Sequence, residues 1–346
     1  MTHVRLTQKI PPGFSLDVDF PLVPGVNALF GPAASGKSLV LDSIAGFTAP
    51  AAGRVMLDDV ILFDAEARVN VPPRRRRCGY IGGRDALFPH MTLRQNLMFA
   101  AAGFARLERH KRVAEMLEHF QLTDVLEAQP RALTPEQKLR GAMARALAAE
   151  PKLLLVDQGG AGYGVDESLL QAIRAVFAGP ILLVTGDLNL CYAAAAELLV
   201  LEAGRLLQRG PARQVIETPD SVAVARLFGI PNLFDVEIAA LDPGRGSSRL
   251  QSEHFALTGP YVPGHFRGDR VWLAVRAEDL RVHSGDLEPQ INYVAADLLR
   301  ASHRTRSVHL EFSNGITAEI PRCEFDRQKD NKTWQVEFPP ESLRVL

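Results

Sequence analysis

An eight-residue segment near the N-terminus limits the fold of this chain more than any other feature. It reads Gly31-Pro-Ala-Ala-Ser-Gly-Lys-Ser38 and fits the pattern G-x-x-x-x-G-K-[ST]. An apolar run at 26–30 precedes it and a helix-compatible stretch at 39–44 follows, which predicts a strand, a loop and a helix. In such loops backbone N–H groups surround nucleotide phosphates, the lysine reaches the β/γ-phosphates and the final hydroxyl binds Mg²⁺. The predicted phosphate-binding residues are Gly31, Pro32, Ala33, Ala34, Ser35, Gly36, Lys37 and Ser38. The structural alternative is a glycine-rich turn before a helix.

The length and charge of the chain narrow the class of protein. At 346 residues two domains are expected, and a formal net charge of −1 gives no reason to expect a nucleic-acid partner. No apolar run is long enough for a membrane span, and no basic-then-apolar signal segment opens the chain. We therefore expect a cytoplasmic protein whose membrane role, if it has one, comes through a partner.

The order of segments predicts an α/β domain followed by a small β domain. Short apolar runs at 153–156 and 181–184 are typical of parallel strands covered on both faces. Residues of about 88–149 show helical spacing and form a predicted helical subdomain within residues 1–230. Residues 231–346 contain alternating strands and an Asn-Gly turn at 314–315, which predicts a hairpin in a separate small β-barrel.

Several stretches resemble a known family. The segments 71–80, 87–97, 151–157 and 275–280 follow the phosphate loop in the order seen in the ATPase subunit of ABC importers, most like the molybdate/sulfate-type subunits with a C-terminal TOBE domain. The resemblance implies a P-loop NTPase fold, that is, an ABC-type nucleotide-binding domain with a helical subdomain, followed by an OB/TOBE-like β-barrel. It also implies ATP and Mg²⁺ as ligands.

The resemblance implies partners and a location as well. Such subunits pair head to tail, as a homodimer or with another ABC ATPase, and bind transmembrane permease subunits. That would place this chain on the inner face of the cell membrane, coupling ATP to the uptake of a solute, with an oxyanion such as molybdate or sulfate suggested by the family alone. Asp157, at the end of an apolar run, matches the carboxylate that helps to order Mg²⁺ together with Ser38. A simple turn residue is the alternative interpretation of Asp157.

Four positions depart from the family pattern. Gln158 replaces the glutamate that polarises the attacking water, and Gly186 replaces the switch histidine. Gly83 occupies the position where the family has the glutamine of the Q-loop, and residues 161–165 differ from the family's D-loop sequence. We therefore assign no catalytic residue and expect slow hydrolysis. The alternative is a catalytically inactive, nucleotide-gated regulatory or scaffolding subunit derived from an ABC ATPase.

The signature segment is altered too. Leu133-Thr-Pro-Glu-Gln137 stands where the family has Leu-Ser-Gly-Gly-Gln. Pro135 removes a backbone N–H and Glu136 adds a negative charge, and both changes oppose the binding of a phosphate from an opposite subunit. The same residues predict a well-capped helix start, with Thr134 as the N-cap and Gln137 closing a capping box.

A few other residues have both a functional and a structural interpretation. Asp187, Asp166 and Glu167 could replace missing catalytic groups, or could be ordinary solvated carboxylates. The run Arg74–Arg77 is interpreted as a solvated loop and not as a nucleic-acid site. Phe14 is the nearest candidate for stacking on adenine, with core packing as the alternative.

Overall fold

The computed structural model describes residues 2–82, 87–158, 164–284, 291–328 and 333–346. The chain divides into two compact units, Met1–Glu217 (the N-terminal unit) and Thr218–Leu346 (the C-terminal unit). The predicted domain boundary at residue 230 stays a prediction.

The N-terminal unit is built on an eleven-stranded sheet in the order β6-β5-β4-β1-β2-β11-β10-β3-β9-β8-β7. The strands are β1 (Thr2–Ile10), β2 (Phe14–Leu22), β3 (Val26–Phe30), β4 (Ala52–Leu57), β5 (Val60–Asp64), β6 (Val69–Asn70), β7 (Cys78–Gly82), β8 (Leu153–Asp157), β9 (Ile181–Val184), β10 (Glu197–Glu202) and β11 (Arg205–Pro211). The strands β10, β3, β9, β8 and β7 pair in parallel, as predicted. The strands β2, β1, β4, β5 and β6 pair antiparallel, because short turns join most of them directly.

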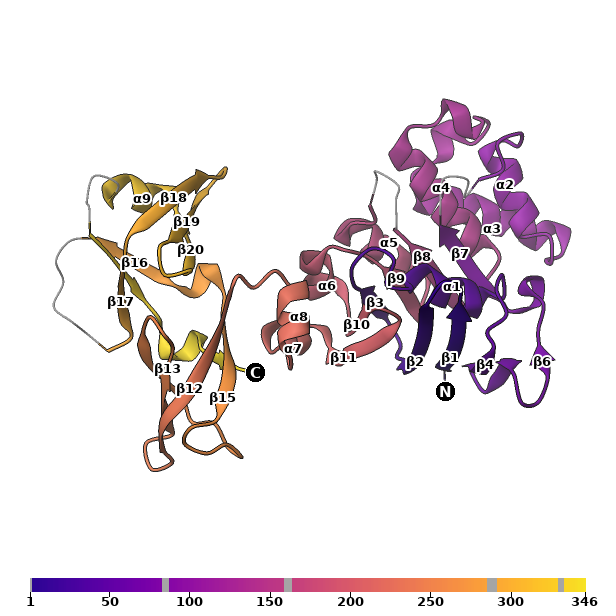
Figure 1. The fold of residues 1–346 in the computed structure, drawn as a ribbon. Helices are drawn as coiled ribbons and strands as arrows, with labels where there is room; N and C mark the ends of the chain where they lie inside the picture. Colours follow the sequence, from indigo (N-terminus) through magenta and orange to yellow (C-terminus); the bar gives the residue numbers. More distant parts are fainter. Residues whose placement is uncertain (1, 83–86, 159–163, 285–290, 329–332) are drawn as a thin grey trace. The chain divides into compact units, whose positions relative to one another are not determined.

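Helices follow the parallel strands. They are α1 (Lys37–Ala45), α2 (Leu93–Ala100), α3 (Arg106–His119), α4 (Pro135–Ala148), α5 (Glu167–Val176), α6 (Leu188–Ala194) and α7 (Ala212–Glu217), with single 3-10 turns η1 (Pro73–Arg75), η2 (Thr123–Val125) and η3 (Pro130–Ala132). Figure 1 shows α2, α3 and α4 gathered beside one another, away from the antiparallel strands β4 and β6. The stretch predicted to be helical from its spacing therefore does form a group of three helices.

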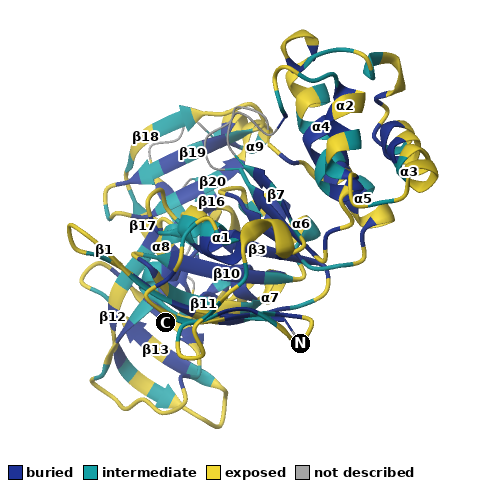
Figure 2. Cartoon of the chain, turned by 90° about the vertical axis from the view of Figure 1, so that its right-hand side faces the viewer, coloured by how far each residue is buried: buried dark blue, intermediate teal, exposed yellow. Residues whose placement is uncertain are grey.

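The sheet of the N-terminal unit has a core on each face. In β8, Leu153 and Leu155 pack with residues of α1, whereas Leu154 and Val156 pack with α4 and α5. This alternation explains why the strand is apolar at every position. Figure 2 shows the same division, with buried residues along the strands and both a buried and an exposed side on the helices α2 and α3.

The C-terminal unit consists mainly of three small sheets, in the orders β14-β13-β12-β15-β22, β16-β21-β17 and β18-β19-β20. Its elements are α8 (Val222–Leu227), β12 (Asn232–Asp242), β13 (Ser247–Gln251), β14 (Ala256–Pro260), β15 (Arg270–Val275), η4 (Ala277–Asp279), β16 (Arg281–Ser284), β17 (Tyr293–Ala296), β18 (Leu298–His303), β19 (Ser307–Phe312), β20 (Thr317–Pro321), α9 (Arg322–Gln328), β21 (Trp334–Glu337), η5 (Pro340–Ser342) and β22 (Arg344–Val345). The predicted hairpin is β19–β20, and Gly315 in its turn has a φ of +76°. One hydrophobic core joins the three sheets, which is consistent with the predicted OB-like β domain.

Candidate nucleotide-binding site

The loop 31–36 joins β3 to α1 and has a backbone that exposes the start of the helix. Ala34 and Gly36 have left-handed φ values of +60° and +103°. A Cβ on Gly31 would lie 2.0 Å from the carbonyl oxygen of Leu201, and one on Gly36 would lie 2.9 Å from the Phe14 ring. Within the described residues, α1 starts without a side-chain cap. Uncapped N–H groups at a helix start are donors for an anion, so the loop suits a phosphate.

Lys37, the first residue of α1, lies back across this loop. Its Nζ donates to the carbonyl oxygens of Gly31 at 3.0 Å and Pro32 at 2.6 Å, and to Ser35 Oγ at 3.2 Å. Burial lowers the pKa of Lys37, and the negative charge of Asp157 partly opposes this decrease.

Three parallel strands end together at this edge of the sheet. Val184 of β9 pairs with Leu29 of β3 on one side and with Asp157 of β8 on the other. The structure thus brings the phosphate loop and Asp157 to the same edge. In open α/β sheets this carboxyl edge is where ligands bind.

Gln158 and Gly186 lie on the segments that follow these strand ends. The Gln158 backbone N–H donates to Val184 O at 3.2 Å, and its side-chain Nε2 donates to Val165 O at 2.9 Å. The amide group is thus held by its own loop. At Gly186 an added Cβ would find no heavy atom within 4 Å among the described residues, its two chain neighbours aside. The described part of the chain therefore leaves room for a larger side chain at this position.

Two of the three carboxylates considered as replacements, Asp166 and Asp187, are helix caps, and the third, Glu167, is the first residue of α5. Asp166 Oδ1 accepts from the Leu169 N–H at 2.8 Å at the start of α5. Asp187 Oδ1 accepts from the N–H groups of Asn189 and Leu190 at 2.8 and 3.2 Å at the start of α6. An N-cap carboxylate satisfies helix donors, so these contacts favour a structural role for Asp166 and Asp187.

The altered signature segment forms the helix start that its residues predict. Thr134 caps α4: its hydroxyl accepts from the Gln137 N–H at 3.2 Å, and Gln137 Oε1 accepts from the Thr134 N–H at 2.9 Å. Pro135 is the first helical residue, and Glu136 pairs with Arg140 at 2.8 Å. The N–H groups of Thr134 and Gln137 are already occupied, Pro135 has none, and the added charge is negative. A phosphate would find little to bind at this helix start.

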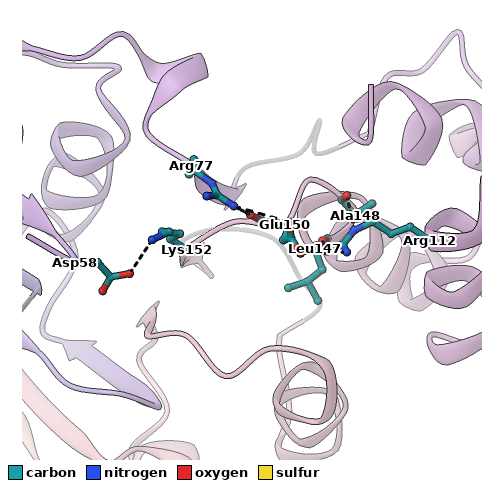
Figure 3. A network of polar contacts seen from close by, with 7 residues as sticks. All are labelled: Asp58, Arg77, Arg112, Leu147, Ala148, Glu150 and Lys152. Carbon is teal, nitrogen blue, oxygen red and sulfur yellow. Dashed lines mark hydrogen bonds and ion pairs between the residues drawn. The ribbon is translucent and has the colours of Figure 1, made fainter. Parts of the chain in front are cut away.

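The opposite end of α4 is held by charged groups from other segments (Figure 3). Arg112 of α3 donates to the carbonyl oxygens of Ala148 at 2.9 Å and Leu147 at 3.2 Å. Arg77 donates to the carbonyl oxygen of Glu150 at 3.2 Å. A cation near the last carbonyls stabilises a helix, so α4 is fixed at both of its ends.

One prediction about the arginine run is wrong. Arg74, Arg75 and Arg77 are exposed, but Arg76 is only 1% exposed and its side chain lies against the end of α1. The sequence offers no signal for this difference, because the acceptors are mostly backbone carbonyl groups. Gly83 and residues 161–163 of the altered D-loop lie outside the described residues.

The helices α2 and α3 border a hollow of about 470 Å³. Its apolar lining includes Met98, Val113 and Leu117, and the charged or polar side chains of Arg94 and Glu118 also line it. The lining thus combines apolar with polar side chains, as the surfaces that bind amphipathic helices do.

A polar cluster centred on Glu337 lies on the sheet β16-β21-β17 of the C-terminal unit. Glu337 pairs with Arg281 at 3.0 Å and with His283 at 2.8 Å, and accepts from the Tyr293 hydroxyl at 3.0 Å. Burial acts to raise the pKa of Glu337. The hydrogen bonds from His283 and Tyr293 and the charge of Arg281 outweigh burial and lower this pKa.

None of the helices in the described ranges has the length and apolar composition needed to cross a membrane. Residues 17–159 match the family described as ABC transporter. The molybdenum import ATP-binding protein ModC of Paramagnetospirillum magneticum is 28% identical over 277 residues, covering 78% of this chain and 75% of the relative. The molybdate/tungstate import ATP-binding protein WtpC of Archaeoglobus fulgidus is 32% identical over 225 residues, covering 64% of this chain and 91% of the relative.

Among solved structures, a dimeric ATP-binding cassette in a post-hydrolysis state with ADP and phosphate has a TM-score of 0.50 and is 24% identical, covering 62% of this chain and 99% of that chain. This likeness supports the fold. Together with the intact phosphate loop and the carboxylate at the adjoining strand end, these matches lead to one conclusion: the chain belongs to the family of ABC transporter ATP-binding proteins.

Proposed function

We propose that this chain is the ATP-binding subunit of an ABC-type importer, which couples the binding and slow hydrolysis of ATP to the uptake of a solute. The observation that carries the proposal is the phosphate loop at the same edge of the sheet as Asp157, where the strands β3, β9 and β8 end together. Residues 31–38 would hold the phosphates, with Lys37 reaching the β/γ-phosphates.

Ser38 and Asp157 would hold Mg²⁺ together with phosphate oxygens. Within the described residues, no group of three His, Cys, Asp or Glu side chains could bind a metal alone. That agrees with Mg²⁺, which usually takes one or two protein ligands, several waters and the phosphates of its substrate. The metal would neutralise charge on the phosphates, and the chain would orient it through one hydroxyl and one carboxylate.

Slow hydrolysis follows from the two replaced positions. Gln158 can orient water but cannot take its proton at neutral pH, and its Nε2 is engaged by Val165 O. Gly186 has no side chain to contact a phosphate. The same observations favour a second candidate, a catalytically inactive subunit in which bound ATP alone acts as the signal.

We propose two kinds of partner. Permease subunits would place an amphipathic cytoplasmic helix in the hollow between α2 and α3, where Val113 and Leu117 offer apolar contacts and Arg94 and Glu118 polar ones. Such partners would hold the chain at the inner face of the cell membrane, in the cytoplasm. The ATP-binding domains would pair with a second copy or with another ABC ATPase, as the dimeric cassette named above does with its own copy.

We further propose that residues 1–230 act as the ATP-binding domain and residues 231–346 as a TOBE-like domain. An oxyanion such as molybdate or sulfate is the proposed solute, supported by the similarity to the molybdenum and molybdate/tungstate import proteins described above. That part of the proposal rests on similarity, because an importer's selectivity resides mainly in its other subunits.

Measurement of ATP binding and phosphate release, for the wild type and for Lys37→Ala, tests the function. The importer proposal predicts ATP binding that Lys37→Ala weakens, and slow phosphate release that the same variant removes. Binding without any release above the Lys37→Ala background, even beside permease subunits, would favour the inactive subunit. If the wild type bound ATP no better than Lys37→Ala, both candidate functions would be refuted.

A further inference from the structure

The C-terminal end of α1 is closed by a side chain from another part of the chain. Arg76, which follows η1, donates through Nη1 to the carbonyl oxygens of Ser43 and Ile44, each at 2.8 Å. Its Nε donates to Val71 O at 2.7 Å, and its Nη2 donates to Asn70 Oδ1 at 2.7 Å. One guanidinium group therefore ties the last turn of the helix to the strand β6 and the turn that follows it.

Backbone N–H groups that follow the helix donate to Asp42 O, and Arg76 supplies the donors for the next two carbonyl groups, those of Ser43 and Ile44. The last turn of α1 has no basic residue of its own, so Arg76 also brings the positive charge that a helix end favours. Arg76 is only 1% exposed, so its charge is held away from water, and this burial lowers the pKa of the side chain. Gly46 permits this approach, because a Cβ there would lie 2.6 Å from the guanidinium carbon.

The segment that carries Arg76 contacts α1 a second time. Tyr80 of β7 donates its hydroxyl to Asp42 Oδ1 at 2.8 Å, and Asp42 lies one helical turn after Ser38. The helix is only nine residues long, and it begins at Lys37. A shift at its C-terminal end would therefore move Lys37 and Ser38, because a short helix moves as a unit.

We propose that Arg76 is a positioning residue for the nucleotide: by fixing the C-terminal end of α1, it holds Lys37 and Ser38 where they reach the phosphates and Mg²⁺. This inference rests on the proposed function, since it assumes that the loop binds ATP. It assigns to Arg76 an effect on ligand affinity in addition to its effect on stability. Arg75, one residue earlier and exposed, has no such role.

The test measures the dissociation constant of the fluorescent analogue mant-ATP, with and without Mg²⁺, on full-length protein shown to be folded by circular dichroism. The variants are Arg76→Met, Arg76→Lys, Tyr80→Phe and the matched control Arg75→Met. We expect Arg76→Met to weaken binding about tenfold, as substitutions within a coupled network do. Arg76→Lys, which keeps the charge but not the planar fork, should recover part of the loss. The gain in affinity from Mg²⁺ should shrink in Arg76→Met, because Ser38 is displaced.

A purely structural role would give another result. In that case Arg76→Met would lower the melting temperature, while the folded protein would bind mant-ATP as tightly as Arg75→Met does, and the inference would be overturned. If Arg76→Met does not fold, unchanged affinity in both Arg76→Lys and Tyr80→Phe would overturn it, and weakened affinity in either would support it. Absence of binding by the wild type would instead refute the proposed function and remove the basis of the inference with it.

Discussion

Placing a general base at residue 158 tests the proposal that Gln158 and Gly186 limit hydrolysis. In the wild type, Gln158 Nε2 donates to the Val165 carbonyl oxygen at 2.9 Å. In Gln158→Glu this attraction becomes a repulsion, because a carboxylate has no hydrogen to donate to the carbonyl oxygen. Loss of this hydrogen bond costs about 1 kcal/mol of stability. It also releases the side chain from its loop, beside Asp157. Adding Gly186→His should place its Cβ without a clash, since no heavy atom of the described residues, the two chain neighbours aside, lies within 4 Å of that position.

A positioned general base contributes about 10²- to 10⁴-fold to a rate. We therefore expect the double variant to release phosphate about a hundredfold faster than the wild type under saturating Mg-ATP, the lower end of that range. Phosphate release is measured with a coupled optical assay, and Lys37→Ala on the double-variant background serves as the control that should abolish the gain. If the double variant folds, binds ATP and still releases phosphate no faster than the wild type, the reasoning is refuted. The defect would then lie elsewhere, with the helix start at Pro135 and Glu136 as the next candidate.

Three further outcomes follow from other contacts. Arg112→Met should lower the free energy of unfolding by about 1–3 kcal/mol, because the end of α4 loses its donors. The control Lys111→Met, at an exposed position, should change this free energy by less than about 0.5 kcal/mol, and denaturant unfolding followed by circular dichroism measures both. Thr134→Ala should cost about 1 kcal/mol in the same assay through loss of the N-cap, without weakening mant-ATP binding. Because the pKa of Glu337 is lowered, its contribution to stability is present above its ordinary pKa and is lost as pH falls through the lowered value. Thermal unfolding followed by tryptophan fluorescence should show this loss, since both tryptophans lie in the C-terminal unit, and Glu337→Gln should reduce the pH dependence.

The parts of the fold that depend on local sequence pattern could be predicted. The apolar runs at 153–156 and 181–184, the helical stripe through Val113 and Met116, and the hairpin turn at Gly315 all appear as expected. The antiparallel strands β4, β5 and β6 were not predicted. Apolar and polar residues alternate irregularly in β4 and β5, and several of their positions are exposed. The pairing of β4 with β1 also joins segments that are distant in sequence.

The residues of the candidate site that belong to a sequence motif could be predicted. The phosphate loop and Asp157 could be placed at one sheet edge from their positions after apolar strands. Arg76 could not be distinguished from its three neighbours, because its acceptors are mostly carbonyl groups of α1 and of residue 71, which any residue supplies. The caps formed by Asp166 and Asp187 were likewise ambiguous until the helix starts were known.

The structure explains how phosphate binding and water activation can separate in one fold. The groups that would hold the phosphates belong to the backbone of 31–36 and to α1, which contributes to the core through Val40, Leu41 and Ile44. Changes there would disturb the fold as well as the ligand. Gln158 is satisfied by Val165 O, and a side chain at residue 186 would meet no core atom of the described residues within 4 Å of its Cβ, so both replacements leave the core untouched. The water-activating positions can therefore be lost at little expense in stability, whereas the phosphate loop cannot. On the proposed assignment, this difference in stability cost explains how the phosphate loop can stay intact while residues 158 and 186 change. Faster hydrolysis in the double variant would show that only the water-activating positions, and not the phosphate-binding groups, had been lost.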